Sequence, residues 1–320
     1  MRHVHIIMFL FFLAPGILLA QQWKKQRKEI FVGIGASNFL GDLGGADQIG
    51  TYGFKDLEPS QTRFSFGAGY RYRFTPALSA KAGVYYGRVS ASDIMTQEPA
   101  RRNRRLEFRS DLIEVSAHFE YALIEEHIKG RYVRGKTRFP VNTYLFGGFG
   151  ICYFNPMSRI NFQGDWIALQ PLGTEGQGLP GMPAKYSRVT LVVPVGIGFK
   201  FPITNQWHIG LEYGVRKTFT DYMDDVSGSY YDRGKIGQAN GPEAEYFADP
   251  ASSPYFVPAS SGYVYTDKTP AFVAKGYENS GWTNPGQLRG NSSKNDFYML
   301  GNVSVSYKLI KGTAKSRVKL

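Results

Sequence analysis

The sequence predicts an all-β protein, an eight-stranded antiparallel transmembrane β-barrel with long extracellular loops. Three observations predict it: the chain begins with an export signal, no later segment reaches the ~20 unbroken apolar residues of a spanning helix, and eight segments alternate apolar with polar or small residues. An exported chain without a spanning helix can still cross a membrane as a closed barrel. Residues 207–227 give the clearest crossing, because Ile209 and Leu211 fall on one side of an extended strand while His208 and Glu212 fall on the other.

Residues 1–20 form the expected cleaved signal peptide, and residues 21–320 form a single barrel domain. Arg2 supplies the positive start, and an apolar run leads to a cleavage site after Ala20. The only cysteine is Cys152, far from that site, so we expect neither a lipoprotein anchor nor an internal disulfide. The formal charge of +12 accompanies no nucleic-acid motif, so we expect no nucleic-acid partner.

The first four crossings are predicted at residues 30–36, 64–74, 78–88 and about 105–122. In the first, Ile30 and Val32 oppose glycines, and in the second, aromatic residues oppose arginine and glycine. The third follows a tight reversal at Thr75 and Pro76, a common turn pair. In the fourth, the alternation changes phase near Asp111, which predicts either a β-bulge or the point where the strand leaves the bilayer.

The remaining crossings are predicted at residues 141–153, 189–201, 207–219 and 297–309. Eight is the smallest usual number of strands, at which side chains fill the interior. The same alternation predicts a lumen charge network made of Arg71, Lys81, Glu114, His118, Lys200, Glu212, Arg216 and Lys308. Because a lone buried charge is costly, we expect these charges to pair as a packed plug rather than line an open channel.

Short turns at residues 75–76 and 204–205 predict the periplasmic end, and the long connections, including residues 220–296, predict the extracellular end. That last loop could fold as a plug, cover the mouth or stay partly disordered. Residues 123–139 and the basic tail 310–320 lie on the periplasmic side. The basic residues expected there are Lys24, Lys25, Arg27, Lys28, Lys129, Arg131, Arg134, Lys136, Lys311, Lys315 and Arg317. They predict either a solvated face touching anionic headgroups or a docking face for an acidic periplasmic partner.

Candidate catalytic groups are sparse. His118 and His208 lie on predicted strands and point inward, while His127 lies in a basic connection, so no nucleophile and base are expected to meet where a substrate arrives. The rim acids lack the spacing of a calcium loop, and we expect them to cap turns and form salt bridges: Asp221, Asp224 and Asp225. We therefore expect no enzyme, no metal and no cofactor.

Four blocks resemble PorG-like outer-membrane proteins of the type IX secretion system: SNFLGDLGG (residues 37–45), FRSDLIEVSAHFEY (108–121), YLFGGFGICYFNP with WIALQPLGTEGQG (144–178) and RKTFTDYMDDVS (216–227). The resemblance implies a non-enzymatic component of a protein transport machinery linked to gliding motility. Its implied periplasmic partners are PorK-like lipoprotein and PorN-like ring subunits, which this barrel would anchor to the outer membrane. The insertion at residues 228–295 and the basic tail depart from the family pattern.

The resemblance also implies an extracellular rim motif that folds over the barrel mouth or meets another outer-membrane secretion component. Its residues are Trp166, Gln170, Asp221, Asp224 and Asp225. Two alternatives remain open from the residues themselves. Barrel size and long outer loops are also typical of a generic OmpA-type structural or adhesive barrel, and fold analogy alone allows a lipid-modifying barrel enzyme.

Overall fold

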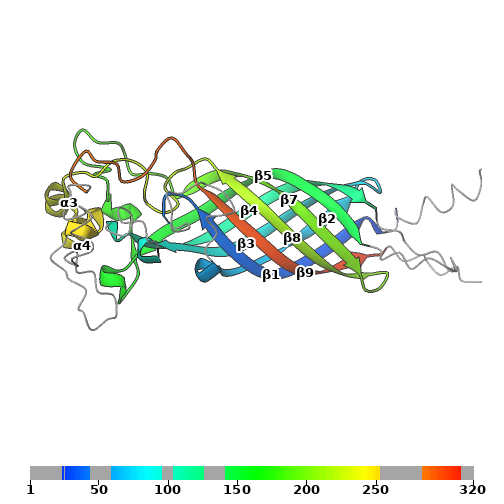
Figure 1. Ribbon diagram of the computed structural model, residues 1–320. Helices are drawn as coiled ribbons and strands as arrows, with labels where there is room; N and C mark the ends of the chain where they lie inside the picture. Colours follow the sequence, from blue (N-terminus) through cyan, green and yellow to red (C-terminus); the bar gives the residue numbers. More distant parts are fainter. Residues whose placement is uncertain are drawn as a thin grey trace, which may run out of the picture.

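The computed structural model describes residues 24, 26–43, 59–95, 104–125, 141–252 and 283–310. Eight antiparallel strands pair in sequence order, and pairing of β4 with β5 and of β1 with β9 closes the barrel (Figure 1). The strands are β1 (Lys28–Leu40), β2 (Arg63–Arg73), β3 (Leu78–Ser92), β4 (Glu107–Ile124), β5 (Asn142–Ser158), β7 (Val189–Pro202), β8 (Trp207–Thr218) and β9 (Phe297–Leu309). The two-residue β6 (Ile167–Ala168) pairs with the end of β5. The predicted fold class is confirmed.

Strand β4 explains the change of phase near Asp111. Its register with β3 and β5 is unbroken there, and the register shift lies instead between Ala122 and Ile124. Asp111 is on the same outward face as Ile113, so the alternation of side-chain direction continues while the polarity of each face reverses. The strand therefore leaves the apolar zone at Asp111, and the alternative of a β-bulge at that point is wrong.

An apolar belt surrounds the barrel. On β4, Ile113, Val115 and Phe119 point outward and are 47%, 57% and 63% exposed. The outward apolar face of β4 runs from Ile113 to Leu123, which corresponds to a height of about 25 Å for a strand tilted by about 40°. A belt of this height and composition matches the hydrocarbon layer of a membrane.

The two ends of the barrel differ. Lys28 pairs with Leu309, so the first and last strands end together, beside two short turns. We call this the terminal end. At the opposite end the described parts of the connections fold into a cap that includes α3 (Arg233–Asn240) and α4 (Pro242–Ala248), as Figure 1 shows. Among the described residues, no helix is long and apolar enough to cross a membrane.

Candidate functional site: the lumen and the cap

The lumen is filled because each strand sends every second side chain inward, and glycines leave room for the long ones. Gly198 of β7 shows the need for this space: a Cβ atom there would lie 2.3 Å from Cζ of Tyr144 on β5. The inward side chains of neighbouring strands can therefore extend across the barrel and meet at its centre.

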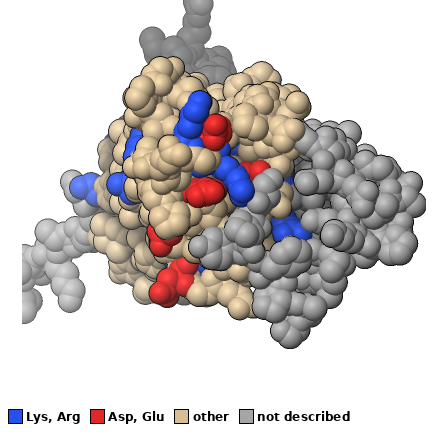
Figure 2. All heavy atoms as spheres, turned by 90° about the vertical axis from the view of Figure 1, so that its left-hand side faces the viewer, with Lys and Arg blue, Asp and Glu red and all other residues tan. Residues whose placement is uncertain are grey.

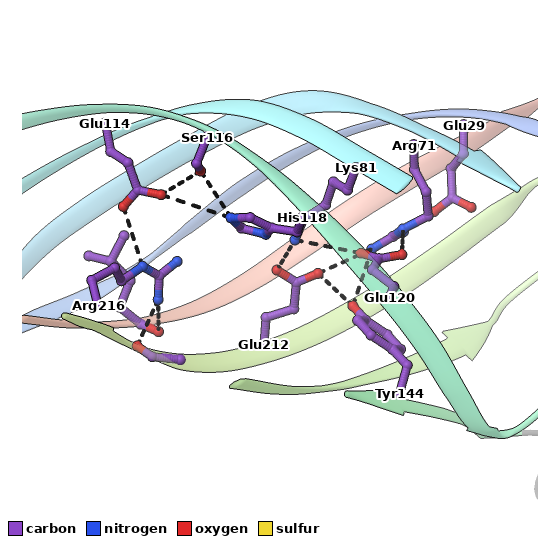
Figure 3. A network of polar contacts seen from close by, with 12 residues as sticks. Glu29, Arg71, Lys81, Glu114, Ser116, His118, Glu120, Tyr144, Glu212 and Arg216 are labelled. Carbon is purple, nitrogen blue, oxygen red and sulfur yellow. Dashed lines mark hydrogen bonds and ion pairs between the residues drawn. The ribbon is translucent and has the colours of Figure 1, made fainter. Parts of the chain in front are cut away.

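Arg71 lies at the centre of the first ionic cluster (Figure 3). Its guanidinium nitrogens lie 2.6 Å from a carboxylate oxygen of Glu29, 2.6 Å from one of Glu120 and 3.1 Å from one of Glu212. Lys81 Nζ lies 2.5 Å from the second oxygen of Glu212, and Lys200 Nζ lies 2.8 Å from Glu29. Three cations thus face three carboxylates from β1, β2, β3, β4, β7 and β8, and the cluster ties opposite walls of the barrel together.

A second cluster lies nearer the cap. The Nε of Arg216 is 3.3 Å from Glu114, and the Tyr298 hydroxyl donates to the same carboxylate at 2.7 Å. The Ser116 hydroxyl also donates to Glu114 and lies 2.9 Å from Nε2 of His118. This arrangement is not a catalytic triad, because the carboxylate is bonded to the serine rather than orienting the histidine, and Ser116 and His118 are only 4% and 2% exposed.

All eight residues of the expected lumen charge network face the interior, including Lys308, which is fully buried. Sequence reasoning left three members out of that network: Glu29, Glu120 and Tyr144. Glu29 was missed because the first strand was predicted to begin one residue later, at Ile30. Its inward position follows from the phase of Phe31, so a longer predicted strand would have found it.

Apolar side chains close the lumen between the second cluster and the cap. Val89, Phe108, Phe154 and Met223 are all fully buried and belong to one packed cluster. Phe108 also meets Phe39 edge to face, with ring centroids 4.8 Å apart. The interior of the barrel is therefore plugged by ion pairs toward the terminal end and by an apolar layer toward the cap.

Arg289 holds the cap together. Its guanidinium lies 3.2 Å from the carboxylate of Glu175 and 3.7 Å from that of Asp225. It also donates to the Thr174 hydroxyl at 3.1 Å and to the backbone carbonyl oxygens of Asp225 and Phe247 at 2.6 and 3.3 Å. One buried side chain thereby joins the segments before β7, after β8 and before β9.

The predicted rim acids have distinct roles. Asp224 accepts backbone N–H groups of Leu43 and Val226, both at 3.0 Å, and so joins the connection after β1 to the one after β8. Asp225 accepts the Tyr186 hydroxyl at 2.6 Å besides its pair with Arg289. In the described part of the chain, no group of three or more histidine, cysteine or acidic residues is placed to hold a metal ion.

Burial keeps protons on the cap acids. Burial raises the pKa of Asp221 to about 8, and raises that of Asp225 to about 6 although Arg289 opposes the shift. Burial, followed by the charges of nearby aspartates, also raises the pKa values of Asp224 and Asp296 well above the usual range. The cap thus contains carboxyl groups that are protonated at pH values where exposed aspartates are ionised.

The other two predicted rim residues lie on the β5–β7 connection. Trp166 contacts both Arg109 and Arg159, whose guanidinium carbons lie 3.9 and 4.4 Å from its ring centroid. Gln170 donates its amide to the backbone oxygen of Tyr186 at 2.9 Å. Figure 2 shows the cap face, where basic and acidic side chains are interspersed rather than separated by sign.

Three of the predicted periplasmic contact residues fall within the described part of the chain. Lys24 and Lys28 are exposed at the terminal end, and Arg27 donates to the Tyr72 hydroxyl at 3.4 Å. The remaining eight lie outside the described residues: Lys25, Lys129, Arg131, Arg134, Lys136, Lys311, Lys315 and Arg317.

Comparisons with known proteins give one family and several distant barrels. The model of a family described as "Domain of unknown function (DUF6089)" matches residues 4–163, half of the chain. No curated protein matches the chain significantly. Similar solved structures include Ail, the attachment invasion locus protein of Yersinia pestis, with 10% identity, a TM-score of 0.36, and coverage of 89% of this chain and 99% of that chain.

Two further solved structures are similar at the same level. Neisserial surface protein A has 9% identity and a TM-score of 0.34, covering 88% of this chain and 95% of that chain. OprG of Pseudomonas aeruginosa has 8% identity and a TM-score of 0.34, covering 89% and 98%. Structural similarities this weak do not support an inference about function.

Proposed function

The chain belongs to the DUF6089 family, and we propose that it is a non-enzymatic barrel of the outer membrane that anchors the periplasmic ring of a type IX secretion system. In this orientation the cap is extracellular, and the terminal end with its short turns is periplasmic. The expected ring subunits are PorK-like and PorN-like, and an outer-membrane neighbour would meet the cap.

One observation carries the proposal: the four sequence blocks that resemble the secretion proteins meet in one folded unit. The N–H of Leu43 in the first block donates to Asp224 in the fourth at 3.0 Å. Asn155 in the third block donates its N–H to the Ser110 hydroxyl in the second at 2.9 Å. Glu175 in the third block accepts the N–H of Ser227 in the fourth at 2.9 Å. Because the four blocks fold together, they can contribute to one surface, which is what we expect if they serve the same function.

The plugged lumen supports an anchor over a conduit. A barrel of this size is filled by its own side chains, and the ion pairs of Arg71 span the interior. Secreted protein therefore has no path through this chain. The surfaces available for contact with partners are therefore the outside of the barrel and its two ends.

The test is charge reversal at the terminal end. The variant Lys24→Glu, Arg27→Glu, Lys28→Glu reverses three cations beside the first strand, and the control Lys185→Glu, Lys217→Glu, Lys235→Glu reverses three at the cap end. We expect the first variant to recover several-fold less ring from its own outer membrane, because electrostatic contacts at a rim weaken on reversal. Equal recovery of the ring by both variants would show that Lys24, Arg27 and Lys28 do not contact the ring.

A structural or adhesive barrel is the second candidate, and the cap favours it. Besides the Arg289 cluster, the cap has apolar cores of its own, such as Leu169 with Tyr246 and Phe247. A cap folded this well could present a fixed surface outside the cell. Under this reading, the chain purifies without a ring under conditions that preserve ring particles.

A further inference from the structure

The outward face of β3, β4 and β5 changes abruptly from apolar to polar and charged at the cap end. Tyr86, Ile113 and Tyr153 pair across the three strands and form the last apolar row of the belt. Two residues further along each strand, the next outward row holds Arg88, Asp111 and Asn155, which also pair in register. This second row therefore lies where the hydrocarbon layer ends and lipid headgroups begin.

Four arginines gather on this face: Arg88, Arg109, Arg159 and Arg188. Arg109 lies diagonally across from both Arg88 and Arg159, because its partners in register are Ser90 and Met157. Arg188 donates to the Asn155 side chain at 3.1 Å and lies 5.7 Å from the ring centroid of Tyr153. We call these four residues the arginine rim.

The carboxylates nearby do not balance the arginine rim. Arg88 pairs with Asp111 at 2.6 Å, and Arg159 pairs with Glu107 at 2.6 Å. Arg109 has no hydrogen bond or ion pair within the described residues, and its guanidinium rests on the ring of Trp166. Four cations thus face two carboxylates, with the unpaired cation between two others of the same sign.

Three strands elsewhere in the barrel lack this concentration of charge. On β8, β9 and β1, the described outward positions at the cap end include a single cation, Lys217. The arginine rim is therefore a local feature of one sector. Nε of Arg109 is buried without a hydrogen-bond partner, so its two terminal nitrogens are the groups left to donate to an anion. A phosphate can accept a guanidinium in two parallel hydrogen bonds.

We propose that the arginine rim binds the phosphate group of an anionic lipid in the outer leaflet, with Arg109 as its centre and Arg88 and Arg159 on either side. The lipid chains lie along the belt below Tyr86 and Tyr153, and the phosphate completes the charge balance that Asp111 and Glu107 leave unfinished. The inference rests on the outer-membrane location in the proposed function and not on the ring.

The test uses the full-length protein purified in detergent and native mass spectrometry. The probes are lipid A carrying two phosphates and the same lipid with both phosphates removed. We expect the wild-type protein to retain the phosphorylated lipid selectively. Arg109→Gln with Arg159→Gln should weaken that binding at least about tenfold, because two bidentate donors are lost. The control Lys217→Gln with Lys235→Gln, equal in charge change, should bind as the wild type does.

Three results would overturn the proposal: equal retention of the dephosphorylated lipid, equal loss of binding in the control, or displacement of the lipid by millimolar inorganic phosphate, which would indicate a site for free anions. If the double variant does not fold, Arg109→Lys decides the question. It keeps the charge but loses the fork, so it should bind more weakly than the wild type, and equal binding would contradict the proposal. Failure of ring capture leaves this assay unaffected, because no ring is present in it.

Discussion

The lumen and the cap are both built around a buried arginine, but the two arginines have different surroundings. Arg71 meets carboxylates from three other strands, and with Lys81 and Lys200 it belongs to a cluster of three cations and three carboxylates. Arg289 meets two carboxylates, and further acids near it, such as Asp224, are held by backbone N–H groups. Strand register can place opposite charges face to face, whereas the cap loops bury more acids than cations and keep some of them protonated.

The largest expected effect is in the lumen. Replacing Arg71 by methionine leaves Glu29, Glu120 and Glu212 short of a cation in a closed interior. Removing one partner of a buried ion pair typically costs about 3–5 kcal/mol, so we expect a loss of that size in the barrel unfolding transition. Chemical denaturation in detergent micelles measures it.

The control for this variant is Arg88→Met, which breaks the half-exposed pair with Asp111. Exposed ion pairs contribute about 0–1 kcal/mol, so this variant should unfold almost as the wild type does. Equal losses in the two variants would mean that the lumen cluster is no stronger than a surface pair.

The corresponding change in the cap is Arg289→Met. We expect a loss of about 3 kcal/mol in the local stability of the cap, because two buried carboxylates and two carbonyl oxygens lose their donor. Hydrogen exchange should rise in residues 171–178 and 221–228 while barrel amides stay protected. Faster exchange of barrel amides in the same variant would show that the two regions are one cooperative unit.

A smaller effect should be the pH dependence of the local stability of the cap. The pKa of Asp221 is raised by burial to about 8 in the folded cap, against about 3.9 in an unfolded chain. The folded cap therefore retains a proton that the unfolded chain loses, and this stabilisation is complete below about pH 4 and disappears as the pH rises to about 8. Asp225, whose pKa is about 6, contributes with the same sign.

We therefore expect the cap to lose at least about 1.4 kcal/mol of local stability between pH 5 and pH 8, the equivalent of one pKa unit. Hydrogen exchange of residues 221–228, corrected for the intrinsic pH dependence of exchange, measures the change. Asp221→Asn should reduce the slope of the profile, because asparagine does not titrate, while Asp225 continues to contribute. A profile as steep as that of the wild type would assign the effect to other groups.

The smallest effect tests how local the cap is. Asp232 caps α3 by accepting the N–H of Lys235, and N-cap replacement by alanine typically costs about 1 kcal/mol. Asp232→Ala should increase exchange in residues 233–240 alone. Loss of protection around Arg289 would show that α3 supports the whole cap.

The barrel could be predicted from the sequence because a period of two fixes which side chains enter the lumen. The last strand was predicted at residues 297–309, the range that β9 occupies. The ends of the longer strands were not predicted: β5 continues from residue 153 to Ser158, where its outward face turns polar at Asn155 while its inward Phe154 and Pro156 stay buried. A strand predicted from alternating polarity ends at such a change, although successive side chains of the real strand still point to opposite faces.

The cap core could not be predicted, because Arg289 lies in an aperiodic loop and its partner Glu175 is 114 residues away. Nothing local marks either residue as buried. The rim motif was found only through family resemblance, and no pattern in the sequence predicts that Trp166 contacts both Arg109 and Arg159. That contact depends on β6 pairing with β5, a two-residue strand without a pattern of its own.

The most direct test of the anchor is a mild-detergent pull-down of this chain from its own outer membrane, with sizing and identification of what remains attached. We expect the wild-type chain to retain a very large assembly that contains a periplasmic lipoprotein ring, and charge reversal at the terminal end to reduce the amount of ring recovered. Recovery of the chain as a lone barrel, under conditions in which ring particles survive, would contradict this expectation.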